Sequence, residues 1–348
     1  MTDLGRVVHE AADALAAKHV GAVVAAMSGD RVEIRGVGAM AATGASAGQP
    51  PSGDTLFEVG SVTKVFTALT LARLAVAGVV DVEEPVADLL PAGTPIPSRD
   101  GEPIRLWHLA THTSGLPRLP KGLLKSVLVG RNREDPYADC TEDYVLGTLA
   151  RTKLAARPGT RFAYSNLGAG LLGIALARRA GLPYDELVAR EITVPLGLSD
   201  TSVAVPPAHA ARLAAGHTKR RKPTSAWDMA SLAGAGGLHA TAQDLLAFVR
   251  VHLDLKAVAD QAFADALRLA RSRQFELATH HHVHLGWMSM QQKGSDTKRL
   301  YWHNGQTGGF VSWVGFVPKR RAGVVVLSNT ARSVDRTGMG LLRRVEAL

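Results

Sequence analysis

The 348-residue sequence predicts an α/β (α+β) protein, with one antiparallel sheet of five or more strands, flanking terminal helices and a mostly helical lobe. Three observations predict this class. Apolar, β-branched runs occur near both ends of the chain, helical periodicity dominates its middle, and amphipathic segments with helical spacing occur at both termini. Strands from both ends are therefore expected to share one sheet. The sheet lobe is expected to comprise residues 1–58 and 285–348, and the helical lobe residues 59–284.

The N-terminal elements follow from local pattern. Residues 4–19 have the apolar spacing of an amphipathic helix. The runs VGAVVAAM (20–27) and RVEIRGVG (31–38) predict two strands, joined by a hairpin turn at SGD. Residues 39–53 are rich in Gly, Pro, Ser and Ala without periodicity, which predicts a loop.

The middle of the chain contains three clear helix patterns. The first runs from Ser61 to about Ala77 and is expected to end at Gly78. The other two cover about residues 166–180 and 241–253, and Thr241 is a candidate N-cap for the last of them.

The C-terminal part changes to strand patterns. Three apolar, β-branched or aromatic runs, RLYWHN, GFVSWVGFVP and AGVVVLSN, are separated by turn residues. A last helix is expected from about residue 333. Together with the two N-terminal strands, these runs account for the five strands of the expected sheet.

Composition limits the classes of function. The excess of 40 basic over 31 acidic residues gives a formal charge of +9. The basic clusters Lys219–Lys222 and Lys319–Arg321 are short and lack interleaved aromatic residues, so no nucleic-acid partner is expected. The single cysteine, Cys140, excludes an intrachain disulfide and is expected to be an unreactive thiol.

The sequence also bears on location. No window contains 18 uninterrupted apolar residues, so no membrane span is expected. The N-terminal segment alternates charged with apolar residues and does not have the pattern of a signal peptide. A cytoplasmic location is therefore expected, or a secreted one if the chain has been trimmed.

Residues 44–48 read GASAG, which matches the G-x-S-x-G pattern of a nucleophile elbow. Such an elbow needs a strand that turns sharply into a helix, whereas Ser46 has a Gly/Ala loop before it and QPPSGD after it. The context therefore favours a loop residue over a nucleophile.

Ser61 and Lys64 have a better context, in EVGSVTKVFTAL. Residues three apart at a helix start share one face, so the lysine is placed to take the serine proton if burial or a nearby cation lowers its pKa. The helix N-terminus also places the Ser61 N–H where it can stabilise an oxyanion. Alone, the S-x-x-K pattern is a weak signal, since a serine and a lysine at this spacing are usually a cap and a solvated side chain.

A second candidate element is RFAYSNLGAG, in which Tyr164 and Asn166 alternate and point the same way if the chain is extended. A phenol beside an ammonium is expected to have a lowered pKa and to relay protons. The asparagine amide suits both a substrate carbonyl and the lysine. The alternative is a tyrosine followed by a helix cap.

The third element is YWHNGQTGGF, a strand that carries His303 and runs into glycines. Its glycines allow a substrate to pair with the backbone as an extra strand, and an N–H near Gln306 would supply a second oxyanion donor. The alternative is an apolar strand that ends in a glycine turn.

These elements, in this order, resemble the serine β-lactamase and penicillin-binding-protein superfamily, in its class C β-lactamase-like branch with DD-peptidases and family VIII esterases. SVTK matches S-x-x-K, YSN matches Y-x-N, and HNG stands at the K-T-G box. Linking stretches such as WHLATHTSGLP, VPLGLSDTS and GAGGLHATAQDL also match, over roughly residues 8–330. The resemblance implies a β-lactamase/transpeptidase-like fold that forms one catalytic unit, with the active site between the two lobes.

The resemblance implies a role for each matched residue: Ser61 as acylated nucleophile, Lys64 as proton-shuttling partner, Tyr164 as acid/base, Asn166 as substrate-orienting amide, His303 and Gly305 lining the strand, and the N–H groups of Ser61 and Gln306 as the oxyanion hole. No cofactor is implied. It leaves open whether Lys64 or Tyr164 is the base during acylation, since the two groups are coupled.

His303 departs from the class C pattern, which has lysine at this place. Histidine is charged only part of the time near neutral pH, and it is similar to some DD-peptidases, D-aminopeptidases and esterases of the branch. With the cytoplasmic expectation, this favours an esterase-like hydrolase that forms an acyl-enzyme with small ester or amide substrates. The alternatives are a β-lactamase or D-alanyl-D-alanine carboxypeptidase/D-aminopeptidase, and a penicillin-binding module without hydrolytic activity.

Three further stretches carry less information. The histidines of HHHVH (280–284) are expected at the surface before a strand rather than at a metal. SDT (199–201) lies after Tyr164 and is not taken as a catalytic box. Residues 118–140 are expected to wall the pocket.

The expected partner is a small-molecule ester, amide or β-lactam substrate, and the sequence leaves the oligomeric state open.

Overall fold

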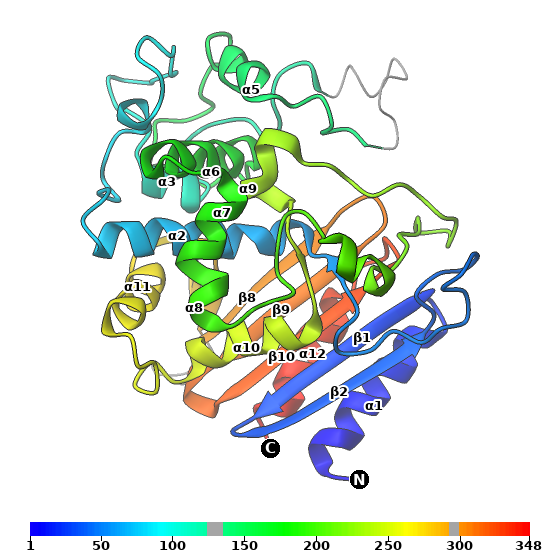
Figure 1. Cartoon of the computed structure of the whole chain (residues 1–348). Coiled ribbons are helices and arrows are strands. Elements are labelled where there is room, and N and C mark those ends of the chain that lie inside the picture. The colour runs from blue at the N-terminus through cyan, green and yellow to red at the C-terminus, as the bar shows by residue number, and fades with distance from the viewer. Residues whose placement is uncertain (124–134, 292–298) are drawn as a thin grey trace.

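The chain folds around one large antiparallel sheet with a helical lobe against one of its faces (Figure 1). A computed structural model describes residues 1–123, 135–291 and 299–348. Among these residues, the sheet has eight strands in the order β2-β1-β10-β9-β8-β7-β6-β5. Their bounds are β1 Gly21–Ser28, β2 Arg31–Gly38, β5 Gln274–Ala278, β6 His281–His284, β7 Met288–Gln291, β8 Arg299–Gln306, β9 Val311–Val317 and β10 Ala322–Ser328.

Strands from the two chain ends pair within one sheet, as predicted. β1 pairs with β2 on one side and with β10 on the other, and the register joins Val24 to Val326. The turn between β1 and β2 includes Gly29, whose φ of +61° suits glycine. The predicted hairpin and all three predicted C-terminal strands are therefore confirmed.

Both faces of the central strands are buried, which explains their continuous apolar runs. In β1, Val23, Ala25 and Met27 belong to the core shared with the helical lobe, while the alternating residues Ala22 and Val24 pack under the terminal helices. Those helices, α1 (Asp3–Ala16) and α12 (Asp335–Val345), contact each other on the far face of the sheet (Figure 1).

The helical lobe is built on α2, which follows a single 3₁₀ turn at Gly60–Val62. The helices between the sheet segments are α2 Thr63–Val76, α3 Leu106–Ala110, α5 Glu142–Leu149, α6 Asn166–Ala180, α7 Tyr184–Val188, α8 Val194–Leu196, α9 Ala233–Gly236, α10 Ala242–Leu253 and α11 Gln261–Ser272. A small second sheet pairs β3 (Phe57–Glu58) with β4 (His239–Ala240).

Local chemistry explains the helix boundaries. Ser165 caps the start of α6 by accepting from the Gly168 N–H, and α6 ends at Gly181 in the left-handed region. The predicted cap at Thr241 is confirmed, since its hydroxyl accepts from the Asp244 N–H. α10 then packs against β10, β9 and β1 on the face opposite α12.

The sheet contains strands that the sequence did not single out. β5 and β6 form a hairpin at residues 274–284, and β7 joins it to β8. The HHHVH stretch is therefore largely strand β6 itself. β5 and β6 thus belong to the sheet although they lie in the segment 59–284, while the lobe boundaries drawn from the sequence stay a prediction.

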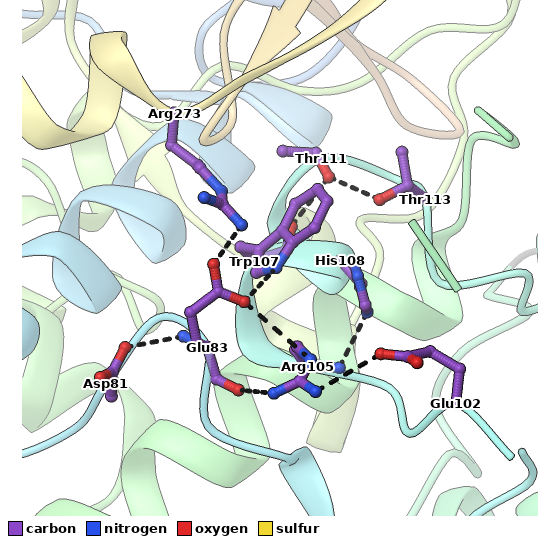
Figure 2. A network of polar contacts seen from close by, with 9 residues as sticks. All are labelled: Asp81, Glu83, Glu102, Arg105, Trp107, His108, Thr111, Thr113 and Arg273. Atoms are coloured by element: carbon purple, nitrogen blue, oxygen red, sulfur yellow. Dashed lines mark hydrogen bonds and ion pairs between the residues drawn. The ribbon is translucent and has the colours of Figure 1, made fainter. Parts of the chain in front are cut away.

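A polar network joins the start of β5 to the helical lobe (Figure 2). The Glu83 carboxylate pairs with Arg273 and accepts from Trp107 Nε1 at 3.0 Å. The Arg273 guanidinium lies over the Trp107 ring, 4.2 Å from its centroid. Arg105 donates to the Glu83 carbonyl at 2.8 Å. The network therefore holds α3, which leads into the candidate site, against the edge of the sheet.

Two general features concern location and reactivity. In the described part of the chain, no helix combines the length and the apolar character needed to cross a membrane. Cys140 is buried, and burial raises the pKa of its thiol to about 11, which agrees with an unreactive thiol.

Candidate active site

Ser61 and Lys64 lie together at the start of α2, between the sheet and the helical lobe. Ser61 is in the 3₁₀ turn and Lys64 is in the first turn of the helix, so both side chains share one face. Lys64 Nζ lies 3.0 Å from Ser61 Oγ and donates to the Ala235 carbonyl at 2.5 Å. This contact brings α9 to the serine–lysine pair.

The environment of Lys64 favours its uncharged amine. Its side chain is buried, and burial is the main cause that lowers its pKa well below 10.5; the positive charge of Arg118 lowers the pKa further. The sequence analysis expected a lowered pKa from burial or a cation, and the structure supplies both. An uncharged amine at this distance from Ser61 Oγ has the lone pair needed to accept the serine proton.

Tyr164 approaches the same serine from the residue before the α6 cap. Lys64 Nζ lies 5.0 Å from the centroid of its ring, and Tyr164 and Ser61 line the same cavity. Burial raises the pKa of Tyr164 to about 12, despite the opposing effects of the Ser61 hydrogen bond and the Arg118 charge. The expected lowering of the Tyr164 pKa is therefore wrong, because burial outweighs both. The phenol is a proton donor throughout the neutral range.

Two glycines allow β8 to approach Ser61. A Cβ on Gly305 would lie 2.0 Å from the Val59 carbonyl oxygen and 2.9 Å from the Ser61 nitrogen. A Cβ on Gly60 would lie 2.8 Å from the Gln306 nitrogen, and Gly60 has a φ of +50°. The two backbone nitrogens predicted as an oxyanion hole, those of Ser61 and Gln306, are therefore brought to one place by residues without side chains.

His303 faces inward from β8 and is buried. Its Nδ1 lies 2.7 Å from the Asn304 carbonyl oxygen. Burial, reinforced by Lys64, lowers the pKa of His303 to about 3. The sequence analysis expected a histidine that is charged part of the time near neutral pH; this is wrong, since the buried ring is uncharged there. His303 therefore does not replace the positive charge of lysine.

Asn166 lies at the first position of α6 and lines the same space. Its Nδ2 donates to the Tyr137 hydroxyl at 3.1 Å, whereas its buried Oδ1 has no hydrogen-bond partner in the described residues. The expected contact with Lys64 is not formed, because that amine bonds Ser61 and Ala235 instead. The Asn166 amide is therefore held by Tyr137 rather than by Lys64.

A cavity of about 510 Å³ opens over Ser61. It is lined by Ser61, Arg118, Leu119, Tyr137, Tyr164, Asn166, Trp227, Asn304, Gly305, Gln306 and Thr307. Arg118 is the only Asp, Glu, Lys or Arg among these described lining residues. Its guanidinium lies 5.1 Å from the centroid of the Tyr164 ring. The cavity thus presents a cation beside the tyrosine.

Four residues around this cavity were not singled out from the sequence, although two of them, Arg118 and Tyr137, lie in the expected wall segment 118–140. His112 packs on Tyr164 with 4.3 Å between ring centroids, and its Nδ1 accepts from the Ser165 N–H at 3.2 Å. Arg118 follows shortly after it. Both lie in or just after WHLATHTSGLP, which was read only as a linking stretch, so its polar residues were the available signal. Figure 2 shows Thr111 and Thr113, on either side of His112, bonded to each other.

Tyr137 and Trp227 are the other two residues that were not singled out. Their rings lie 5.3 Å apart and form one wall of the cavity. They are 90 residues apart in sequence, and no local pattern pairs them. The expectation that residues 118–140 wall the pocket holds for Arg118, Leu119 and Tyr137; residues 124–134 lie outside the described part of the chain.

The remaining sequence candidates lie elsewhere. Ser46 is in the loop between β2 and β3, as expected from its context. In β6, His284 is buried and His282 is partly exposed, with 6.3 Å between their ring centroids. Within residues 1–123, 135–291 and 299–348, no three His, Cys, Asp or Glu side chains are grouped so as to hold a metal.

A family model and several known proteins match this chain in sequence. The family model described as Beta-lactamase matches residues 8–348. The chain is 30% identical to the D-alanyl-D-alanine-carboxypeptidase/endopeptidase AmpH of Escherichia coli K12, an alignment that covers 80% of this chain and 71% of that protein. It is 29% identical to a beta-lactamase of Pseudomonas fluorescens, over 81% of each chain.

Solved structures have the same overall fold. A beta-lactamase/D-alanine carboxypeptidase from Yersinia pestis, complexed with citrate, superposes with a TM-score of 0.82 at 27% identity, covering 99% of this chain and 98% of the other. A protein of the same description from Pseudomonas syringae gives a TM-score of 0.82 at 23% identity, with the same coverage, and supports the fold alone.

Proposed function

Since this chain belongs to the Beta-lactamase family of serine hydrolases, we propose that it hydrolyses the last amide bond of short peptides that end in a free carboxylate, above all D-alanyl-D-alanine peptides. In this proposal Ser61 forms the acyl-enzyme and the terminal D-alanine is released. The observation that carries the specificity is the charge of Arg118 in a cavity whose other polar residues are uncharged.

Arg118 is suited to bind a substrate carboxylate. Its guanidinium makes no ion pair with any described residue, and its carbonyl oxygen accepts from the Asn166 and Leu167 N–H groups, which fixes its backbone beside the Y-x-N segment. An arginine fork matches the geometry of a carboxylate. Because the buried His303 is uncharged at neutral pH, Arg118 takes over the role of the missing lysine.

The residues then share the chemistry as follows. As Ser61 Oγ bonds to the carbonyl carbon, its proton passes to the uncharged Lys64 amine, and the oxyanion accepts from the Ser61 and Gln306 N–H groups. Tyr164 donates its proton to the leaving amine as the C–N bond breaks, and the proton on Lys64 then restores the phenol. Water hydrolyses the ester on Ser61. The lowered pKa of Lys64 and the raised pKa of Tyr164 support Lys64 as the acylation base.

Two other substrate classes have specific support. A β-lactam presents a carboxylate and a strained amide, and the Pseudomonas fluorescens relative is named a beta-lactamase. Small neutral esters, which the sequence analysis favoured, suit the uncharged His303 but make no use of Arg118. A peptide that ends in a carboxylate makes use of the Arg118 charge and does not need a charged His303. The AmpH relative is named a carboxypeptidase.

A substrate panel tests the proposal. The purified chain is assayed with a peptide ending in D-Ala-D-Ala, the same peptide with its C-terminus amidated, a chromogenic cephalosporin and p-nitrophenyl butyrate. We expect the free-acid peptide to have the highest kcat/KM. Arg118→Gln should lose at least about tenfold in kcat/KM on this peptide and little on the amide. Ser61→Ala should lose more than about 10³-fold on every substrate.

Other results would overturn the peptide proposal. Faster turnover of the ester or the cephalosporin assigns the chain to the corresponding alternative. Acylation by a fluorescent penicillin without turnover of any substrate indicates a penicillin-binding module. The cytoplasmic location stays a prediction, and immunoblotting of fractionated producing cells tests it.

A further inference from the structure

A buried carboxyl group lies behind the wall of the cavity. Glu58 is in β3, three residues before Ser61, and its side chain is only 3% exposed. Its Oε1 accepts from the backbone N–H of Trp227 at 3.2 Å. Trp227 lines the cavity, so the carboxyl directly holds one of its walls.

Trp227 links two parts of that wall. On one side its ring lies 5.3 Å from the ring of Tyr137. On the other side it covers Gly308, where an added Cβ would lie 2.5 Å from Trp227 Nε1. A small displacement of Trp227 therefore changes the shape of the cavity between Tyr137 and the turn after β8.

The turn after β8 contributes a second group that acts on the Glu58 carboxyl, the Thr307 hydroxyl. Glu58 Oε2 and Thr307 Oγ1 are both buried, and neither has a well-formed hydrogen bond to any described residue. The Thr307 hydroxyl nevertheless acts on the carboxyl as a hydrogen-bond partner, so the two groups lie within reach of each other. Thr307 directly follows Gln306, whose N–H belongs to the candidate oxyanion hole.

We propose that Glu58 is a positioning residue: its ionised carboxylate holds Trp227 and the Thr307 turn in place for substrate capture, and protonation of the carboxyl loosens this wall. The inference rests on the catalytic pocket described above, and not on whether peptides, esters or β-lactams are preferred.

The two protonation states make different contacts. An ionised carboxylate accepts at both oxygens, and hydrogen bonds to a charged acceptor are stronger than those to a neutral one. A protonated carboxyl donates from one oxygen, so Thr307 must change from donor to acceptor. Burial raises the pKa of Glu58 to about 7, the charge of Asp135 raises it, and the bonds from Thr307 and Trp227 lower it. Both states are therefore populated near neutral pH.

The first test measures the wall without any substrate. Tryptophan fluorescence is titrated from pH 5.5 to 8.5 in the full chain and in Trp227→Phe, and the difference isolates Trp227. We expect a single transition with a midpoint near pH 7. Glu58→Gln keeps the shape and the Oε1 acceptor but mimics the protonated acid, so it should abolish the transition. Absence of the transition in the unsubstituted protein, or its persistence in Glu58→Gln, would overturn the proposal.

Two further variants change the midpoint in opposite directions. Thr307→Val removes a group that stabilises the ionised form, so the midpoint should move to higher pH. Asp135→Asn removes a like charge, so the midpoint should move to lower pH. Because both variants keep Glu58, they test the proposal even if Glu58→Gln does not fold. Unchanged midpoints in both would contradict the proposal.

The kinetic test separates capture from chemistry. With p-nitrophenyl butyrate, KM of the unsubstituted protein should rise about three- to tenfold from pH 8 to pH 6. Glu58→Gln should have the higher KM at both pH values and an almost unchanged kcat at pH 8, because the hydrogen-bond partners of Glu58 among the described residues are Trp227 and Thr307 and not Ser61, Lys64 or Tyr164. If the KM of Glu58→Gln changes with pH in the same way as the KM of the unsubstituted protein, the proposal is overturned. Failure of the peptide specificity leaves these readouts unaffected.

Discussion

Gly305 lies so close to Ser61 that a Cβ on the glycine would be 2.9 Å from the backbone nitrogen of the serine. On the neighbouring strand, the Ser312 hydroxyl donates to the Val59 carbonyl at 2.7 Å, which ties β9 to the segment before the serine. The two oxyanion donors therefore depend on the close approach of two backbones, which any side chain at Gly305 prevents.

Replacement of Gly305 by alanine should displace β8 from Ser61. We expect Gly305→Ala to lower kcat by about 10²-fold or more, because an oxyanion donor is lost or displaced. Gly340, in α12, is the matched control, since a Cβ there meets nothing within 4 Å. Gly340→Ala should leave kcat unchanged and stabilise the fold by about 0.5–1 kcal/mol. Ester turnover and thermal melting measure both effects, and equal kcat values for the two variants would contradict this account.

Arg118 should control the pH at which Lys64 becomes an active base. The protonated amine cannot accept the Ser61 proton, so kcat/KM should rise with pH through the pKa of Lys64. Since the Arg118 charge lowers that pKa, Arg118→Gln should move the acid limb to higher pH. A neutral ester is the substrate to use, because no carboxylate then contacts Arg118. An unmoved acid limb would show that Arg118 does not act on the lysine.

Tyr164 should act as a proton donor to the leaving group. With a pKa of about 12, its phenol stays protonated below pH 10, so no alkaline limb from this residue is expected in that range. Tyr164→Phe should lower kcat/KM for an amide substrate by about 10²–10⁴-fold. The loss should be smaller for a p-nitrophenyl ester, whose leaving group departs without a proton. Equal losses on both substrates would assign Tyr164 another role.

His252 should make the fold sensitive to acid. Its ring is fully buried, stacks on Phe316 at 5.0 Å, and neither ring nitrogen has a hydrogen-bond partner in the described residues. Burial lowers the pKa of His252 well below 6.5, so the unfolded chain binds a proton that the folded chain does not. Its contribution to stability is complete above about pH 6.5 and is lost as the pH falls below that value.

His252→Phe should remove this dependence. The free energy of unfolding of the unsubstituted protein should fall below pH 6.5 more steeply than that of the variant, by about 1.4 kcal/mol per pH unit. His281→Gln, at an exposed position of β6, is the control and should keep the slope of the unsubstituted protein. Urea unfolding between pH 4.5 and 7.5 measures the slopes, and parallel curves for His252→Phe and the unsubstituted protein would contradict the prediction.

Much of the fold could be predicted because its signals are local. The β1–β2 hairpin, the three apolar strands after residue 298 and the cap at Thr241 each depend on a few neighbouring residues. The hairpin of β5 and β6 was missed because its residues are polar and partly exposed, and its strands are specified by pairing with the sheet more than by their own composition.

The candidate site divides in the same way. Ser61, Lys64, Tyr164 and His303 stood out as motifs, and the three-residue spacing alone places Ser61 beside Lys64. The protonation states did not follow from the motifs. Tyr164 was expected to have a lowered pKa and His303 to be partly charged, yet burial raises the first pKa and lowers the second.

The sequence by itself determined five of the sheet strands, the clearest helices, the S-x-x-K, Y-x-N and H-N-G elements and the reaction class, because these are properties of short segments. Only the tertiary structure decided which residues far apart in the sequence are buried close to one another. It placed Arg118 by Lys64 and Tyr164, and Glu58 behind Trp227 and Thr307. Burial and the distance between charges set a pKa, and both are defined only when the chain has folded.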